Sequence, residues 1–147
     1  NQITIDIIKE RIKKDDCKEG FIFDGFPRNI EQAESIDKFI EFDKIFEINI
    51  SDGEAIKRLH GRWMCECGAN YNVLTAPRPK TQGICDECGG KLFQREDDKN
   101  LDAIEKRLEV YHKETEPIIE KYKDKIIKID GEQPIEEISQ DIMKEFK

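Results

Sequence analysis

GFIFDGFPRNIEQ (residues 20–32) joins a short apolar run to an acid, a glycine, a proline and an arginine. The apolar run is bounded by Gly20 and by a turn that contains Gly25 and Pro27, a pattern typical of a buried strand. From Ile30 onward the apolar side chains recur at three- and four-residue intervals, which predicts a helix. A strand, a turn and a helix in quick succession favour an α/β fold with a parallel sheet.

The same alternation of periods appears on both sides of this stretch. Residues 3–13 place isoleucines at helical spacing and predict an amphipathic helix. Residues 44–50 and 125–130 are short and rich in isoleucine, and they predict two further strands. The predicted architecture is a parallel sheet flanked by helices.

Capping residues and prolines indicate where several helices begin. Ser51 and Glu54 have the spacing of a capping box, which predicts a helix start at that point. Pro117 interrupts a periodic segment, so we expect two helices there, with Thr115 as a cap between them. Pro134 suits the first position of a closing helix.

The composition limits the classes of partner. The chain has 147 residues, enough for one main domain, and 39% of them are charged, with a net charge of -8. This acidity argues against broad electrostatic binding to nucleic acid or to an anionic membrane. The sequence shows neither a membrane-spanning stretch nor the pattern of a signal peptide. We therefore expect a cytoplasmic protein that binds neither nucleic acid nor membrane.

One segment breaks the alternating pattern. Between residues 61 and 98, glycines, prolines and paired cysteines crowd together and no apolar period survives. We interpret this segment as a small inserted domain. It separates a first core part, residues 1–60, from a second, residues 99–147.

Four of the five cysteines form two tight pairs inside the insert. Four thiolates close a tetrahedral zinc shell without an open position, which indicates a structural metal rather than a catalytic one. Unligated thiols are the alternative, and the acidic flanks of the insert argue against a nucleic-acid-binding ribbon. The candidate ligands are Cys65, Cys67, Cys85 and Cys88. Cys17 is left over, and we expect it to be a half-buried thiol without function.

A second group of candidate residues combines arginines with one acid. The arginines lie at turns, at helix ends or at the borders of the insert, and the planar guanidinium is suited to gripping phosphate oxygens. An aspartate that follows a buried strand is suited to holding Mg²⁺ through its waters, an arrangement that serves phosphoryl transfer. The group consists of Asp24, Arg28, Arg58, Arg62, Arg95 and Arg107.

Six motifs, which follow one another along the chain, together resemble a known protein family. GFIFDGFPRNIEQA, LHGRWMCECGANYN, CDECGG, FQREDD, KRLEVYHKETEPIIEKY and IDGEQP together resemble the bacterial adenylate kinases whose lid carries a zinc ribbon. The resemblance covers essentially the whole chain. It implies the parallel sheet of the nucleoside monophosphate kinases, a lid at residues 61–98 and a monomeric enzyme. The implied reaction is reversible phosphoryl transfer from ATP to AMP, giving two ADP, with Mg²⁺ bound to ATP.

The resemblance also implies roles for single residues. Asp24 would lie near the Mg²⁺ shell, and Gly25 would line the AMP pocket. Arg28 would grip the AMP phosphate, and Gln32 would read the adenine edge. The remaining residues would bind or close on ATP and the transferring phosphates: Arg58 against the ATP base, Gln133 beside the adenine, and Arg62, Arg95 and Arg107 on the phosphates, with Arg95 and Arg107 also contacting AMP.

The chain departs from the family pattern in several places. The family begins with a strand and a glycine-rich phosphate loop that ends in Gly-Lys, and the printed sequence contains no such motif. We therefore expect the first βα unit to be absent and the printed polypeptide alone to have negligible kinase activity. Smaller departures are the Cys-x-Cys spacing, Trp63 where an arginine is common, and one extra residue before Arg107.

Two rival functions stay open at this stage. One is a kinase for UMP or CMP, although Gln32 and the long cysteine-bearing insert favour adenylate. The other is a non-catalytic zinc-ribbon interaction module, although such a module has no need of the segment from Asp24 to Arg28.

Overall fold

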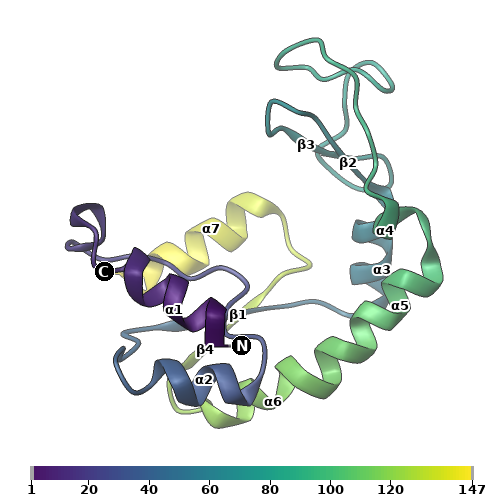
Figure 1. Ribbon diagram of the computed structural model, residues 1–147. Helices are drawn as coiled ribbons and strands as arrows, with labels where there is room; N and C mark the ends of the chain where they lie inside the picture. The colour runs from purple at the N-terminus through teal and green to yellow at the C-terminus, as the bar shows by residue number, and fades with distance from the viewer. Residues whose placement is uncertain (1, 147) are drawn as a thin grey trace. The chain divides into compact units, whose positions relative to one another are not determined.

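The first sheet combines two strands from distant parts of the sequence. The computed structural model describes residues 2–146, and in it β1 (Ile45–Asn49) and β4 (Ile126–Asp130) form a two-stranded parallel sheet (Figure 1). Both strands are rich in isoleucine, whose branched side chain suits a pleated surface. The strands predicted at 44–50 and 125–130 are confirmed to within one residue at each end.

The apolar run at residues 20–24 is not a strand. Residues 20–23 have no regular secondary structure, and Ile22 is 91% exposed. Phe23 instead packs its ring against Phe26 and Phe42. A strand needs a neighbour to satisfy its backbone N–H and C=O groups, and no strand in residues 2–146 pairs with this segment. The prediction of a buried strand here was wrong.

The chain divides into two compact units. The first comprises residues up to Glu47 together with Val110–Lys128, and the second comprises Ile48–Glu109 together with the residues from Ile129 onward.

Three helices build the first unit around a small apolar centre. These are α1 (Gln2–Arg11), α2 (Ile30–Ile36) and α6 (Glu116–Lys121), and a short 3₁₀ turn, η1 (Asp15–Cys17), follows α1. Helix α2 packs against both α1 and α6. The buried side chains are Ile5, Ala33, Ile36 and Ile118. The predicted helix at 3–13 is confirmed, although it ends two residues early.

A widened helical turn replaces the predicted break before Pro117. Helix α5 (Leu101–Val110) continues through a π-helical turn, η2 (Tyr111–Thr115), directly into α6. A proline ring inside an α-helix collides with the carbonyl four residues earlier, and a wider turn moves that carbonyl away. Thr115 does not cap α6, because its hydroxyl donates to the carbonyl of Arg28 at 2.9 Å. The prediction of two separate helices with a Thr115 cap was wrong.

The second unit begins with a capped helix. In α3 (Asp52–Gly61), the Ser51 hydroxyl accepts a hydrogen bond from the N–H of Glu54, as the capping box predicts. The reciprocal bond is absent, since the Glu54 carboxylate pairs with Arg58 instead. Glu132 takes the place of Glu54 as the acceptor: its carboxylate accepts hydrogen bonds from both the N–H and the hydroxyl of Ser51, at 2.9 and 2.6 Å. The start of the helix is therefore tied to the chain near residue 132.

The insert is a small ribbon. Strand β2 (Arg62–Met64) pairs antiparallel with β3 (Asn70–Asn72), with Trp63 opposite Tyr71. A short helix, α4 (Glu96–Lys99), follows the ribbon. The buried core of the ribbon is made of Cys65, Tyr71, Cys85 and Leu92. Because two of these four side chains are cysteines, apolar burial alone contributes little to holding the ribbon together.

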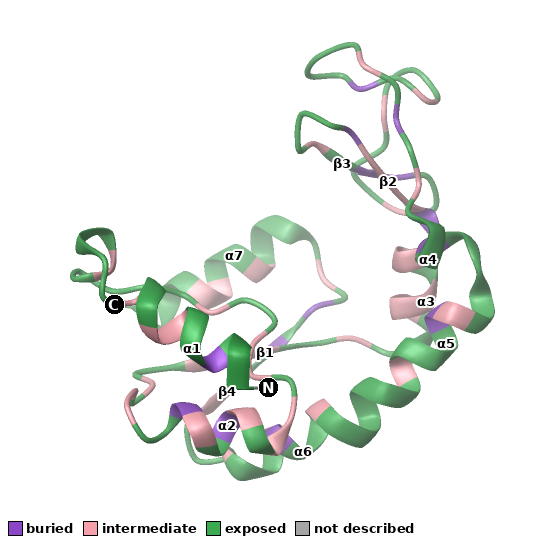
Figure 2. Ribbon diagram, viewed as in Figure 1, coloured by how far each residue is buried: buried purple, intermediate pink, exposed green. Residues whose placement is uncertain are grey.

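The closing helix exposes most of its apolar stripe. Helix α7 (Ile135–Lys144) begins one residue after Pro134, which was predicted at its first position. Ile135 is 64% exposed and Met143 is 58% exposed, and the helix contains no fully buried residue (Figure 2). Among residues 2–146 there is no helix of the length and apolar character that a bilayer crossing requires.

Two glycines of α3 should respond in opposite ways to alanine. A Cβ at the buried Gly61 would overlap the side-chain oxygen of Asn72, whereas one at Gly53 meets nothing within 4 Å. We expect Gly61→Ala to lower the free energy of unfolding by about 1–3 kcal/mol through overpacking. We expect Gly53→Ala to raise it by up to about 1 kcal/mol, because alanine favours a helix over glycine. Urea unfolding checks both, and equal effects at the two sites would contradict the packing at Gly61.

Candidate functional site

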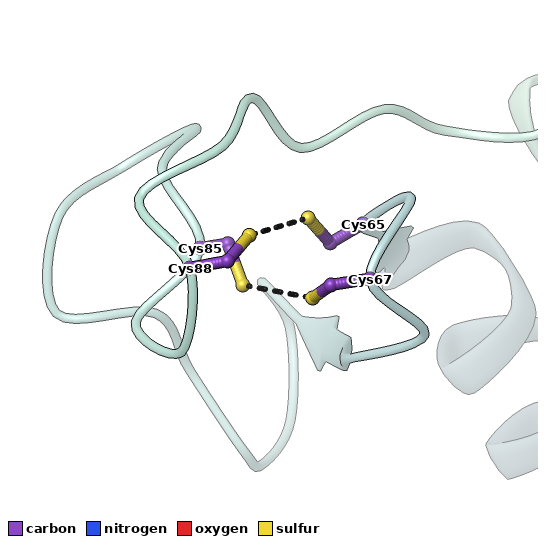
Figure 3. A group of neighbouring side chains, drawn as sticks. All are labelled: Cys65, Cys67, Cys85 and Cys88. Carbon is purple, nitrogen blue, oxygen red and sulfur yellow. Dashed lines mark hydrogen bonds between the residues drawn. The ribbon is translucent and has the colours of Figure 1, made fainter.

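The four paired cysteines come together as predicted. Their sulfur atoms all lie within 4.8 Å of one another, and none of the four forms a disulfide (Figure 3). The Sγ atoms of Cys65 and Cys88 are 3.4 Å apart, and those of Cys67 and Cys85 are 3.6 Å apart. Four sulfurs around a tetrahedral zinc ion at its usual bond length would be about 3.8 Å apart. The donor set and its spacing therefore fit a single tetrahedral ion.

Tight turns bring each cysteine pair to the cluster. After Cys65 the chain reverses through Gly68, whose φ of +98° is in the left-handed region that favours glycine. Gly68 donates its N–H to the carbonyl of Cys65 at 3.0 Å. In the second pair, the N–H of Cys85 donates to the carbonyl of Gly90 at 2.8 Å. The tight Cys-x-Cys spacing, which departs from the family pattern, is thus compatible with the four-sulfur cluster.

The sulfurs differ in their surroundings. Burial alone raises the pKa of the Cys85 thiol, but hydrogen bonds from the Tyr71 hydroxyl and from backbone N–H groups outweigh it and lower the pKa to about 6. The N–H of Gly90 and the Cys65 thiol lower the pKa of Cys88, but the sulfurs of Cys67 and Cys85 together with burial outweigh them and raise it. Without a cation, one thiolate therefore opposes the ionisation of the others, and a bound cation would remove that opposition.

The loop from Asp24 to Arg28 has a specific shape in the first unit. Arg28 donates its Nε–H to the carbonyl of Gly25 at 2.6 Å and its backbone N–H to the side-chain oxygen of Gln32 at 2.8 Å. Gly25 has φ of +68°, and a Cβ there would lie 2.9 Å from Arg28 Nη2. Thr115 adds a hydrogen bond to the carbonyl of Arg28. The loop therefore holds the guanidinium by one edge, and among the described residues its Nη atoms have no hydrogen-bond partner.

Asp24 is exposed at the start of this loop. Its carboxylate makes no ion pair within the part of the chain that the structure describes. Gln32 lies in the first turn of α2, where its N–H donates to the Asn29 side chain at 2.9 Å. Asp24, Gly25, Arg28 and Gln32 thus belong to one short segment of the first unit.

Most of the candidate arginines in the second unit are paired with acids. Arg58 donates to Glu54 at 2.7 Å, and Arg95 lies 3.8 Å from Asp97. Within residues 2–146, Arg107 is exposed and has no ion-pair partner. Gln133 donates its side-chain N–H to Asp141 at 2.8 Å. Convergence of these side chains with Asp24 and Arg28 around one nucleotide stays a prediction.

Asp98 is the buried partner of the candidate residue Arg62, and the sequence did not single it out. It accepts two hydrogen bonds from Arg62, from Nε at 2.8 Å and from Nη2 at 2.9 Å, and its side chain is 1% exposed. Its backbone carbonyl also contacts His60 and Gln94. The neighbouring Asp97 is 70% exposed. An acidic run offers no signal in the sequence that distinguishes a buried member from an exposed one.

Comparison with known proteins places these features in a family. The family model for adenylate kinase matches residues 1–127. The adenylate kinase of Caldicellulosiruptor bescii is 43% identical over 152 residues, which cover 98% of this chain and 70% of that protein. The adenylate kinases of Methanocella arvoryzae and Caldanaerobacter subterraneus are each 45% identical, and the chain covers 68% of each.

The buried carboxylate of Asp98 should contribute strongly to stability. Asp98→Asn keeps the shape of the side chain but leaves Arg62 without its charged partner. We expect it to lower the free energy of unfolding by about 3 kcal/mol. Asp97→Asn is the matched control, and we expect a change within ~0.5 kcal/mol because that residue is exposed. Urea unfolding followed by Trp63 fluorescence measures both, and an equal effect of the two changes would contradict the burial of Asp98.

Proposed function

The chain belongs to the adenylate kinase family, and we propose that its full-length gene product transfers a phosphoryl group reversibly between ATP and AMP, giving two ADP. The observation that carries this proposal is the loop that holds Arg28 by one edge and leaves its other edge free. A planar guanidinium with two free N–H groups on one edge matches the oxygens of a phosphate. The assignment of ATP and AMP as the substrates rests on membership of the adenylate kinase family.

On the AMP side, three residues of the loop take separate roles. Arg28 binds the phosphate of AMP, and Gly25 lines the pocket beside it. Gln32 reads the edge of the adenine. Two hydrogen bonds support this assignment: Arg28 Nε–H donates to the carbonyl of Gly25 and orients the guanidinium, and the backbone N–H of Arg28 donates to Gln32 and fixes the chain beneath it before the ligand arrives.

On the ATP side, we assign Arg58 and Gln133 to the adenine and Arg62 to the phosphates. Arg95 and Arg107 contact the transferring group and the AMP phosphate. Arg62 is bound to Asp98 through Nε and Nη2, so Nη1 supplies the free N–H groups. The guanidinium N–H groups that these arginines keep available stabilise the negative charge that spreads over the transferring group.

Magnesium accompanies ATP in this proposal. The carboxylate of Asp24 is exposed and is a hard oxygen donor, which fits Mg²⁺ held through water. When bound, Mg²⁺ neutralises phosphate oxygens of ATP. The insert at residues 61–98 acts as a lid whose closure excludes water, which competes with AMP as acceptor.

The cysteine cluster holds a structural zinc ion. The four sulfurs fill all the positions of a tetrahedral ion and leave none for a substrate. A ribbon with so small an apolar core would draw most of its folding free energy from the metal. Reduced thiols of this kind suit the cytoplasm, where we place the protein as a monomer.

We prefer AMP over UMP or CMP as the substrate, and an enzyme over a non-catalytic zinc-ribbon module. The relatives are adenylate kinases rather than UMP or CMP kinases. A non-catalytic zinc-ribbon module would not explain why Gly25, Gln32 and Thr115 all orient Arg28, which lies outside the ribbon.

Replacing Arg28 tests the proposed reaction. We expect the full-length gene product to form ADP from MgATP only when AMP is present, with far lower turnover on UMP or CMP. Arg28→Ala should raise KM for AMP by about 10- to 100-fold, the loss expected for hydrogen bonds to a charged group, and should change KM for ATP little. Arg78→Ala, an exposed arginine of the insert, is the control and should match wild type. Lack of AMP-dependent ADP formation by wild type would refute the function, whereas an unchanged KM for AMP in Arg28→Ala would refute only the role of Arg28.

Metal analysis tests the zinc site separately. We expect close to one zinc per chain in wild type and in Cys17→Ser, and a loss of zinc in Cys85→Ser. Chelation should also change the emission of Trp63, the single tryptophan, because it packs against the ribbon core. Zinc retained by Cys85→Ser at the wild-type level would contradict the four-cysteine site.

A further inference from the structure

Tyr71 lies directly behind the cysteine cluster. It is in β3, its side chain is part of the ribbon core, and it is 7% exposed. Its hydroxyl oxygen is 3.6 Å from the Sγ of Cys85, a hydrogen-bond distance for sulfur. The backbone N–H of Asp86 donates to the same oxygen at 2.8 Å. The hydroxyl therefore contacts both the sulfur of one candidate ligand and the backbone of the next residue.

The chemistry of these partners determines where the hydroxyl proton points. A backbone N–H can only donate, so the bond from Asp86 occupies a lone pair of the tyrosine oxygen and not its proton. A cysteine bound to a metal is a thiolate and can only accept. The proton of Tyr71 is then directed at Cys85, which makes this a hydrogen bond to a charged acceptor.

Cys85 is one of the two buried ligands, and Tyr71 adds a side-chain donor to the backbone N–H groups that already reach it. It is 2% exposed and Cys65 is 4% exposed, whereas Cys67 and Cys88 are exposed and can receive hydrogen bonds from water. Four thiolates around one divalent cation carry two net negative charges. Two carboxylates, Asp86 and Glu87, also stand between the second pair of cysteines in the sequence. A buried thiolate in this setting requires a donor from the protein itself.

We propose that Tyr71 is a positioning residue of the metal site: its hydroxyl donates to the Cys85 thiolate, orients that sulfur toward the ion and disperses its charge. The same hydroxyl ties β3 to the turn that carries Cys85 and Cys88 through the N–H of Asp86. This inference rests on the proposed zinc site and is independent of the kinase reaction. It extends the site beyond its four ligands to a residue that metal-binding motifs do not include.

Removing one oxygen atom tests the proposal. Tyr71→Phe keeps the ring and its packing but deletes the donor, so we expect zinc affinity, measured by competition with a chromophoric chelator, to fall about 10-fold or more. In the Co²⁺-loaded protein, the thiolate-to-cobalt charge-transfer band should shift relative to wild type, because one sulfur has lost a hydrogen bond. Tyr111→Phe, which changes a tyrosine outside the insert, is the matched control and should leave both readouts unchanged.

A measurement on the wild-type chain covers the case in which Tyr71→Phe folds poorly. In protein loaded with ¹¹³Cd²⁺, the hydroxyl proton of Tyr71 should be protected from exchange and should show coupling to cadmium through the sulfur. Unchanged affinity and an unchanged cobalt spectrum in Tyr71→Phe, or a hydroxyl proton without coupling, would overturn the proposal. Failure of the wild-type chain to bind any of these metals would overturn the zinc site and with it the role of Tyr71.

Discussion

The hydrogen bond from Arg28 Nε to the carbonyl of Gly25 sets the orientation of a guanidinium that the proposed chemistry depends on. The bond forms because Gly25 adopts a left-handed conformation in which a Cβ would crowd Arg28. Gln32 and Thr115 hold the backbone of Arg28 from either side. An arginine on a free loop would lose much of its conformational freedom on binding a phosphate. In this loop that cost has largely been met when the chain folds, so the free edge of the guanidinium is ready for an anion.

The insert differs from this loop because it has little apolar burial, and its shape is proposed to depend on ion pairs and on a metal bound by the four cysteines. Four sulfurs and two apolar side chains make up its centre. At its base, the buried carboxylate of Asp98 holds Arg62 in place. A ribbon stabilised by directional bonds keeps its internal shape without a large core, which suits a segment proposed to close and open as one piece. The tight cysteine spacing is accommodated by turns rather than by strain, because no non-glycine residue in the described chain has a positive φ.

The sequence predicted the elements whose signals are local. Helical periodicity located α1 and α2, the isoleucine-rich runs located β1 and β4, and the Ser51 capping box marked the start of α3. The four-cysteine cluster followed from spacing alone. Features that depend on distant residues were missed. The run at 20–24 has the composition of a strand but no partner strand, and Glu132 supplies half of a cap that the motif assigned to Glu54. Pro117 was taken to break a helix, but the chain passes it through a π-helical turn. Asp98 was overlooked because burial is a tertiary property.

The central claim is the proposed gathering of Arg28, Arg58 and Arg62 around one nucleotide complex, and paramagnetic relaxation tests it most directly. In the full-length gene product with AMP bound, Mn²⁺-ATP is added and the Nε–H signals of the arginines are followed by NMR. The account predicts that the signals of Arg28, Arg58 and Arg62 broaden together, while those of Arg11 and Arg78 stay sharp. Broadening of Arg58 and Arg62 with no effect on Arg28, or equal broadening of all the arginines, would contradict it.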